Sequence, residues 1–254
     1  MAFHQESAED TAMPQPLSIR FLLAAGGVLL TASAIAPAAE PPQGWSGSAE
    51  LGAVYTTGNT DNTSFDGKLT VNYLRAPWEH GLLLQAYTAS ESGQRTGERY
   101  LANYKGRRDL SERSYAFGNL RYEDDRFSGF RYQASQTLGY GRRLIDSEHH
   151  KLKGELGVGA RQSETETGEQ NRVAVGTLGG DYTWLISPTS SFLQTLLVVA
   201  GEDNTEVSAV STLKVRIHQA LALAVGLDVK HNTDVPAGRK NTDTKTTINL
   251  VYDF

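Results

Sequence analysis

The sequence contains no cysteine, so neither a disulfide framework nor thiolate chemistry is available to the protein. Long apolar runs are also scarce, and after Ala39 no stretch is long and apolar enough to cross a bilayer as a helix. Internal repeats, low-complexity tracts and linkers rich in glycine or serine are absent as well. These absences exclude a disulfide-stabilised module, a helical membrane domain after Ala39 and a repeat array.

The N-terminal region has the pattern of a secretory signal. The stretch from Phe21 to Ala39 carries no charge and follows Arg20, and Ala36-Pro37-Ala38 supplies the small-x-small pattern of a signal-peptidase site. We predict a cleavable signal peptide over residues 1–38, and an uncleaved anchor helix is the alternative. Acidic residues before Arg20 do not suit a signal peptide, so we expect translation to start at Met13.

After a short lead-in at residues 39–44, the chain alternates apolar and polar residues in about twelve segments of roughly ten residues each. Between Leu221 and Lys230, for example, every second residue is apolar, whereas Asp228 and Lys230 lie on the opposite parity. About 215 mature residues suffice for one all-β domain. The pattern predicts an all-β fold over residues 45–254, an antiparallel up-and-down β-barrel. Alternation alone does not decide whether the apolar face points into a soluble core or out to lipid.

Three features favour a barrel that spans a membrane. Long polar connections, such as Ala89 to Gly97, are expected to alternate with tight turns, such as Ala76-Pro77. Aromatic residues fall near the ends of the predicted strands, as interfacial girdles require. The last strand carries Tyr252 and Phe254 on its apolar face and resembles the closing strand of outer-membrane barrels, where this ending is an assembly signal. A closed barrel also satisfies its backbone groups in lipid.

Three motifs of the predicted barrel share their order with a known family. They are Thr57-Gly58-Asn59-Thr60-Asp61, Tyr122-Glu123-Asp124-Asp125-Arg126-Phe127-Ser128-Gly129 and Gly139-Tyr140-Gly141-Arg142-Arg143-Leu144-Ile145-Asp146. On these motifs the segment from Trp45 to Phe254 resembles the YdiY-like family of salt-induced outer-membrane proteins. The resemblance implies an outer-membrane β-barrel and brings no catalytic residues. Its implied partners are outer-membrane lipid, lipopolysaccharide and the barrel-assembly machinery, with no nucleic acid.

Two of these motifs also have a local interpretation. Gly58-Asn59 tolerates positive φ angles and predicts a tight hairpin turn. The segment from Asp124 to Gly129 predicts an ion-paired turn, and the alternative is a contact of its carboxylates with a divalent cation or lipopolysaccharide.

Signatures of hydrolases are missing. The sequence has no Gly-x-Ser-x-Gly nucleophile turn and no His-Glu-x-x-His zinc helix. The His-x-Ser pair of outer-membrane phospholipases and the Asp-x-Asp and Asp-x-His pairs of omptin proteases do not occur either. His149-His150 could bind a metal, but its place in a predicted turn indicates solvated surface. We expect no enzymatic activity, cofactor or metal, with a barrel-borne hydrolase as a remote alternative.

The polar faces of the predicted strands would line the lumen, and basic side chains predominate on them. The candidate lumen-lining residues are Lys68, Lys105, Arg107, Arg131, Arg143, Lys153, Arg161, Lys214, Arg216, Lys230, Glu155 and Asp228. Leu83, Phe117 and Leu193 share the polar parity, which a bulge, a partly filled lumen or a shifted register would explain.

An open lumen of this composition would favour anions, whereas ion pairs could also close it. The predicted function is a narrow passive channel with a preference for anions, or a structural component of the envelope. The alternative is a soluble periplasmic or secreted β-barrel that binds a small apolar ligand, with its faces reversed.

Overall fold

The computed structural model describes residues 43–56, 62–235 and 240–254, which form twelve β-strands. The strands are β1 (Gly44–Thr56), β2 (Asn62–Arg75), β3 (Trp78–Glu91), β4 (Gln94–Asp109), β5 (Ser114–Asp125), β6 (Phe130–Asp146), β7 (His150–Thr165), β8 (Gln170–Ser187), β9 (Ser190–Gly201), β10 (Thr205–His218), β11 (Leu221–Asn232) and β12 (Thr242–Asp253). This part of the chain has no helix that is long and apolar enough to cross a bilayer. The predicted signal peptide and the predicted turn at Gly58-Asn59 lie outside the described residues.

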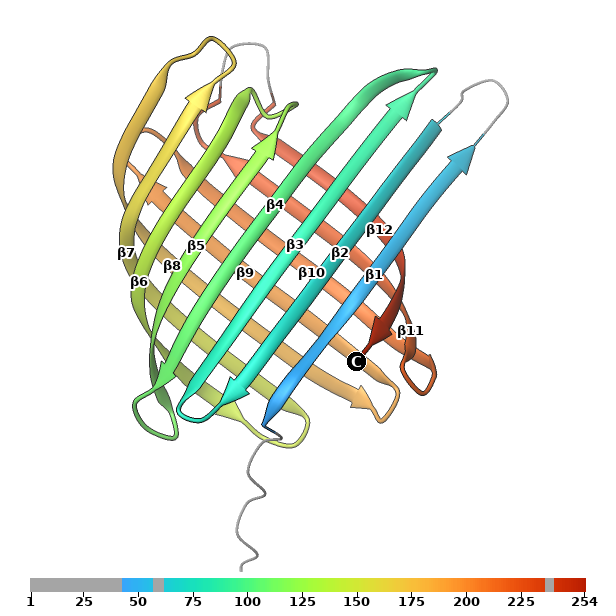
Figure 1. Cartoon of the computed structure of the whole chain (residues 1–254), viewed down its shortest axis with the longest axis vertical. Helices are drawn as coiled ribbons and strands as arrows, with labels where there is room; N and C mark the ends of the chain where they lie inside the picture. Colours follow the sequence, from blue (N-terminus) through green and yellow to red (C-terminus); the bar gives the residue numbers. More distant parts are fainter. Residues whose placement is uncertain (1–42, 57–61, 236–239) are drawn as a thin grey trace, which may run out of the picture. The chain divides into compact units, whose positions relative to one another are not determined.

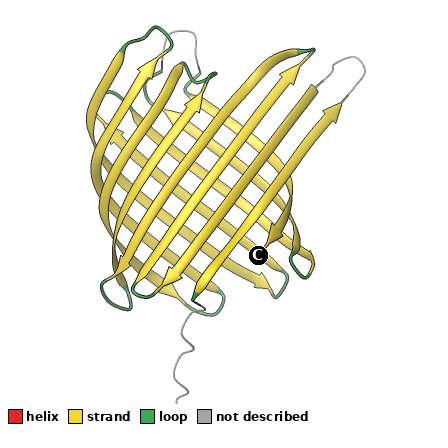
Figure 2. Cartoon of the chain, in the orientation of Figure 1, coloured by secondary structure: helices red, strands yellow, loops and turns green. Residues whose placement is uncertain are grey.

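Each strand pairs antiparallel with its neighbours in sequence, and β1 pairs with β12, so the sheet closes into a barrel of tilted strands (Figure 1). Gly47 and Phe254 exchange backbone hydrogen bonds of 2.8 and 3.0 Å at this closure. Where the structure describes the connections between strands, they are turns and loops (Figure 2). Closure removes the unpaired strand edges that an open sheet would expose. The predicted all-β, antiparallel up-and-down barrel of about twelve strands is confirmed.

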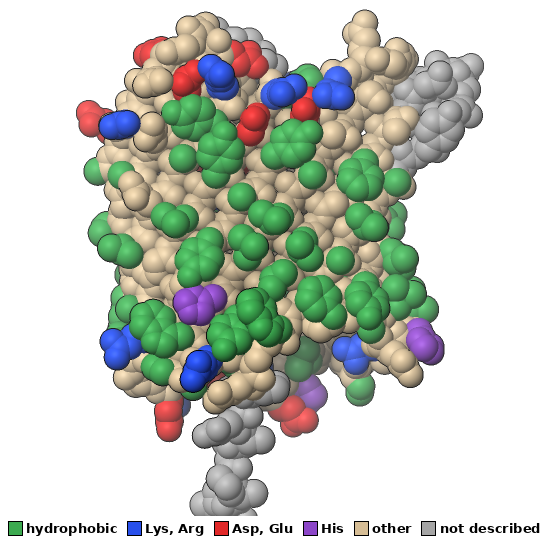
Figure 3. Space-filling view, viewed as in Figure 1, with side chains coloured by type: hydrophobic (Ala, Val, Ile, Leu, Met, Phe, Trp, Pro, Cys, Tyr) green, Lys and Arg blue, Asp and Glu red, His purple; other side chains and the backbone are tan. Residues whose placement is uncertain are grey.

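Side chains divide between the two faces of the sheet by strand parity. On neighbouring strands of the outer surface, Leu138, Leu156 and Val158 are 71%, 66% and 70% exposed. Glu123 and Lys230, by contrast, are buried inside the barrel. Figure 3 shows hydrophobic side chains spread over the strands, with charged side chains gathered toward the two ends. The arrangement is the reverse of a soluble protein, in which charged groups face the solvent.

The barrel has one end with the turns after β2, β4, β6, β8 and β10, here called the turn end, and an opposite loop end. At the loop end, β3 and β4 are joined by a two-residue turn at Ser92-Gly93, with φ angles of 50° and 76°. Positive φ at both positions suits the twist of a tight hairpin. The predicted long loop from Ala89 to Gly97 is therefore wrong, because its polar residues continue the strand pairing, as in Ser90 with Arg95.

Aromatic side chains cluster on the outer surface toward both ends. Toward the loop end, the rings of Tyr122 and Tyr132 stack with their centroids 6.0 Å apart. Toward the turn end, His150 stacks on Tyr182 and Trp184 and lies 2.8 Å from the Tyr182 hydroxyl. The sequence placed His150 in a solvated turn, but the residue begins β7, whose first side chain faces the neighbouring aromatic rings of β8.

Candidate functional site

Two aromatic side chains of β5 fill part of the lumen. Tyr115 and Phe117 point inward and are 0% and 7% exposed. On β6, a Cβ atom added to Gly141 would lie 2.3 Å from the Tyr115 ring, and one added to Gly139 would lie 2.5 Å from the Phe117 ring. The two glycines therefore leave the space that the rings occupy. A partly filled lumen is thus the explanation for Phe117 on the polar parity.

Charged side chains hold Tyr115 in place. The guanidinium groups of Arg107 and Arg143 lie 4.8 and 5.5 Å from the centre of its ring. Its hydroxyl donates a hydrogen bond of 2.9 Å to Glu155 Oε1, and Lys105 Nζ also contacts this carboxylate at 2.5 Å. We call Lys105, Arg107, Tyr115, Phe117 and Glu155 the aromatic layer. Because these side chains come from β4, β5 and β7, the layer ties one wall of the barrel together.

Nearer the loop end, a second group of side chains joins opposite walls. Lys230 Nζ on β11 lies 2.8 Å from Glu123 Oε1 on β5 and 3.3 Å from Glu206 Oε2 on β10. In the closed order of the sheet, five strands separate β5 from β11 in either direction. The Lys230–Glu123 pair therefore crosses the lumen.

Two arginines complete this group. Arg121 Nη2 lies 2.6 Å from Glu123 Oε2 and 3.8 Å from Glu206, and Arg99 Nε lies 3.0 Å from Glu123 Oε1. Arg99 Nη1 also reaches Asp228 at 3.4 Å. We call Arg99, Arg121, Glu123, Glu206, Asp228 and Lys230 the charge cluster. Its three cations match its three carboxylates, so buried charges are compensated without a bound ion.

A third contact lies across β1. Lys245 Nζ on β12 is 2.8 Å from Asp66 Oδ2 on β2, and Asn249 Nδ2 donates to Asp66 Oδ1 at 3.1 Å. These bonds brace the lumen side of the β1–β12 closure.

Cavities lie beside both groups of lumen side chains in the part of the barrel that the structure describes. The one beside the charge cluster measures about 250 Å³ and is lined by residues that include Tyr87, Phe127 and Lys245. The other, beside the aromatic layer, measures about 140 Å³ and is lined by residues that include Asn72, Lys153 and Asp181.

Most of the candidate lumen-lining residues form polar contacts inside the barrel or at its mouths. Those with an ion pair are Lys68, Lys105, Arg107, Arg143, Arg161, Lys214, Lys230, Glu155 and Asp228. Lys153 faces the smaller cavity and forms no ion pair with the residues that the structure describes, and Arg216 is exposed at the turn end.

Arg131 differs from the prediction. Its side chain is 74% exposed at the loop end and pairs with Glu164 at 2.9 Å instead of lining the inner lumen. The pairing of β6 with β7 shifts between Phe130 and Tyr132, and such a bulge changes the direction of the side chain.

The sequence interpretation missed several lumen charges. Arg99, Glu79, Asp109, Glu206 and Asp253 all form ion pairs with inward-facing residues. With these carboxylates included, most of the inward-facing cations have an acidic partner. Strand parity could have identified them: Glu79, Asp109, Glu206 and Asp253 lie at or next to a strand end, whereas Arg99 is the sixth residue of β4.

The predicted ion-paired turn after β5 is partly self-contained. Asp125 Oδ1 accepts a hydrogen bond of 3.1 Å from the Phe127 N–H, and Ser128 Oγ donates to the Asp125 carbonyl at 2.8 Å. The arginine of the motif, Arg126, pairs outside the turn with Glu98 on β4 at 3.3 Å. The turn is thus anchored to the neighbouring hairpin.

Comparisons with known proteins identify a family for this barrel. The family described as "Protein of unknown function, DUF481" matches residues 49–254. The chain is 28% identical over 209 residues to the uncharacterized protein YdiY of Escherichia coli (strain K12), with 82% of each chain covered.

Solved structures with a similar fold include the NanC porin, with a TM-score of 0.49 and 11% identity over 82% of this chain and 98% of that one. An outer-membrane channel from Pseudomonas putida F1 gives a TM-score of 0.49 and 13% identity over 85% and 97% of the two chains. The family match covers most of the barrel, so this protein belongs to the DUF481 family, and the YdiY-like resemblance of its motifs is confirmed.

Proposed function

We propose that this protein is a non-enzymatic barrel of the outer membrane, with its turn end in the periplasm and its loop end at the cell surface. The outward-facing side chains support this location. Leu138, Val158 and Ile248 are all more than half exposed, and an apolar surface that encircles the molecule would drive aggregation in water. In a bilayer the same surface contacts lipid, while the closed sheet satisfies the backbone.

We further propose that the lumen is closed at rest and that the protein serves as a structural component of the envelope. The observation that carries this proposal is the contact of Lys230 with Glu123 across the barrel. A hydrated solute could pass only if this buried ion pair separated, and separation would leave charges without partners in a confined space.

A narrow channel with a preference for anions is the second candidate. Lys153 and Arg216 favour it, because both are cations on the lumen parity without an ion pair among the residues described. Unpaired cations along a pore attract anions. This function requires that the charge cluster opens.

Single-channel recording in a planar bilayer tests both candidates. The chain from residue 39 onward would be refolded, and a heat-modifiable gel shift would verify the folded barrel. We expect folded protein without discrete conductance steps. Steady steps that favour chloride over potassium would refute the closed lumen and establish the channel. A chain that stays monodisperse in buffer and does not enter vesicles would refute the membrane location.

A further inference from the structure

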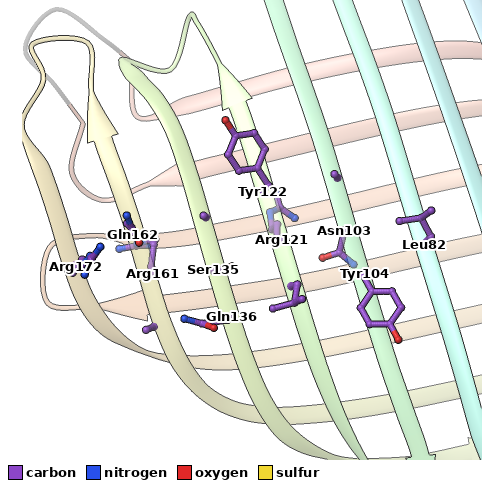
Figure 4. A pocket seen from close by; sticks show the side chains of 14 residues that line it. Leu82, Asn103, Tyr104, Arg121, Tyr122, Ser135, Gln136, Arg161, Gln162 and Arg172 are labelled. Carbon is purple, nitrogen blue, oxygen red and sulfur yellow. The ribbon is translucent and has the colours of Figure 1, made fainter.

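A groove of about 710 Å³ crosses the outer surface from β3 to β8 (Figure 4). Small side chains form its floor, namely Ala102, Ala134 and Ala160, and larger ones such as Tyr104 and Tyr122 border it. Five of the lining residues follow one another as cross-strand partners, in the order Ala102, Tyr122, Ala134, Gln162 and Arg172. The groove therefore runs across the strands and reaches the loop end at β8.

Polar side chains concentrate in the part of the groove that lies toward β8. Figure 4 shows Gln136, Gln162 and Arg172 together there, whereas Leu82 and Tyr104 lie at the other end. Gln162 Nε2 donates to the Tyr132 hydroxyl at 3.3 Å.

Gln136 and Arg172 differ from Gln162 in this respect. Gln136 and Arg172 are exposed and form no hydrogen bond or ion pair with the residues that the structure describes. By comparison, the outward-facing amide of Gln194 on β9 accepts a hydrogen bond of 2.5 Å from Ser211. An amide that faces hydrocarbon without a partner is unfavourable, so the groove calls for a ligand that has polar groups as well as apolar chains.

We propose that this groove binds a phosphorylated glycolipid of the outer leaflet, the lipid A class of lipopolysaccharide. The proposal rests on the proposed location in the outer membrane. Arg172 is the third residue of β8, near the loop end, where the lipid headgroups lie. Its guanidinium is charge-complementary to a phosphate and can donate two parallel hydrogen bonds to it.

The dimensions and chemistry of the groove suit this lipid. From Leu82 on β3 to Arg172 on β8 the groove spans five strand spacings, or about 24 Å at ~4.8 Å each, which accommodates a fatty acyl chain. The alanine floor lets the chain approach the sheet closely. Gln136 lies two strands from Arg172, where it can pair with the amide, ester or hydroxyl groups that join acyl chains to the phosphorylated sugar.

Native mass spectrometry of the folded full chain, titrated with lipid A or with phosphatidylglycerol, tests the proposal. We expect lipid A to bind more tightly than phosphatidylglycerol, because only lipid A carries amide-linked hydroxyacyl chains for Gln136. Loss of a charge-assisted contact in Arg172→Ala is expected to weaken lipid A binding by about 10-fold or more. Ala134→Phe, which fills the floor, is expected to weaken both lipids.

The chain offers matched controls. Arg142→Ala removes an exposed, outward-facing arginine at the turn end, and Ala209→Phe enlarges an outward alanine on β10. Neither is expected to change lipid A binding. Equal effects of Arg172→Ala and Arg142→Ala would overturn the proposal, and so would equal affinity for the two lipids. The proposal would also be overturned if native mass spectra showed dimers of the parent chain that disappear in Gln136→Leu. The groove would then be assigned to a second copy of the chain.

Membrane insertion is measured on the same samples by the gel shift in vesicles. A chain that does not insert would refute the proposed function itself. A chain that inserts without a preference for lipid A would refute only the assignment of the groove.

Discussion

Replacing Lys230 with methionine removes one of the cations that join opposite walls of the barrel. The side chains of Lys230, Glu123 and Glu206 are at most 6% exposed, so the carboxylates left behind cannot recruit bulk water. Breaking a buried ion pair by removing one partner costs about 3–5 kcal/mol. Among the described residues, Glu123 keeps Arg99 at 3.0 Å and Arg121 at 2.6 Å, whereas Glu206 keeps Arg121 alone, at 3.8 Å. We therefore expect the lower value, about 3 kcal/mol, mainly from Glu206.

The free energy of unfolding would be measured by urea titration of the barrel in lipid vesicles, followed by tryptophan fluorescence. Trp45, Trp78 and Trp184 all lie on the outer surface and report the loss of lipid contact. Adding Glu206→Gln to Lys230→Met restores the balance of charge, so we expect a favourable coupling of about 1 kcal/mol or more between the two changes.

Lys68→Met is the matched control for this experiment. Within the described ranges, Lys68 forms an ion pair with Glu50 alone, at 2.8 Å, and its side chain is 28% exposed. Water can replace part of the lost interaction there, so the expected cost is about 1 kcal/mol or less. A loss below about 1 kcal/mol for Lys230→Met, or strict additivity with Glu206→Gln, would refute the reasoning that the ion pairs of the charge cluster hold the barrel together.

Three further predictions concern the surface, the glycines and the closed lumen. Leu213→Arg or Leu227→Arg places a charge on the lipid face and should destabilise the inserted barrel by about 2–4 kcal/mol. The gel-shift assay should therefore show less folding into vesicles for either variant. Leu110→Arg, which lies in a turn, should fold like the parent chain. Gly141→Ala forces a Cβ to within 2.3 Å of the Tyr115 ring and should destabilise the barrel to urea by about 1–3 kcal/mol, a loss that Tyr115→Ala in the same chain should relieve. The double variant Tyr115→Ala, Lys230→Ala should conduct ions in planar bilayers where the parent chain does not, and a silent double variant would contradict closure by these two layers.

The sequence by itself determined the class of fold and the division of residues between two faces. Side chains on a strand alternate because of backbone geometry alone, so the parity of Leu138 or Lys230 can be read from its immediate neighbours. Tight turns such as Ala76-Pro77 were predictable for the same reason, since their chemistry is local. The loop at Ala89 to Gly97 was not, because polar residues suit an extended hairpin as well as a loop.

Only the tertiary structure decided which face is outside and which charges meet. Lys230 and Glu123 are separated by 107 residues, and their contact depends on the closure and curvature of the whole sheet. The space for the Tyr115 ring likewise depends on Gly141, because the pairing of β5 with β6 places this glycine opposite Tyr115. The bulge that exposes Arg131 is also a property of paired strands. The alternation of apolar and polar residues in the sequence indicates to which face of its own strand a side chain points. The partners of that side chain depend on how the fold brings together strands that are distant in sequence.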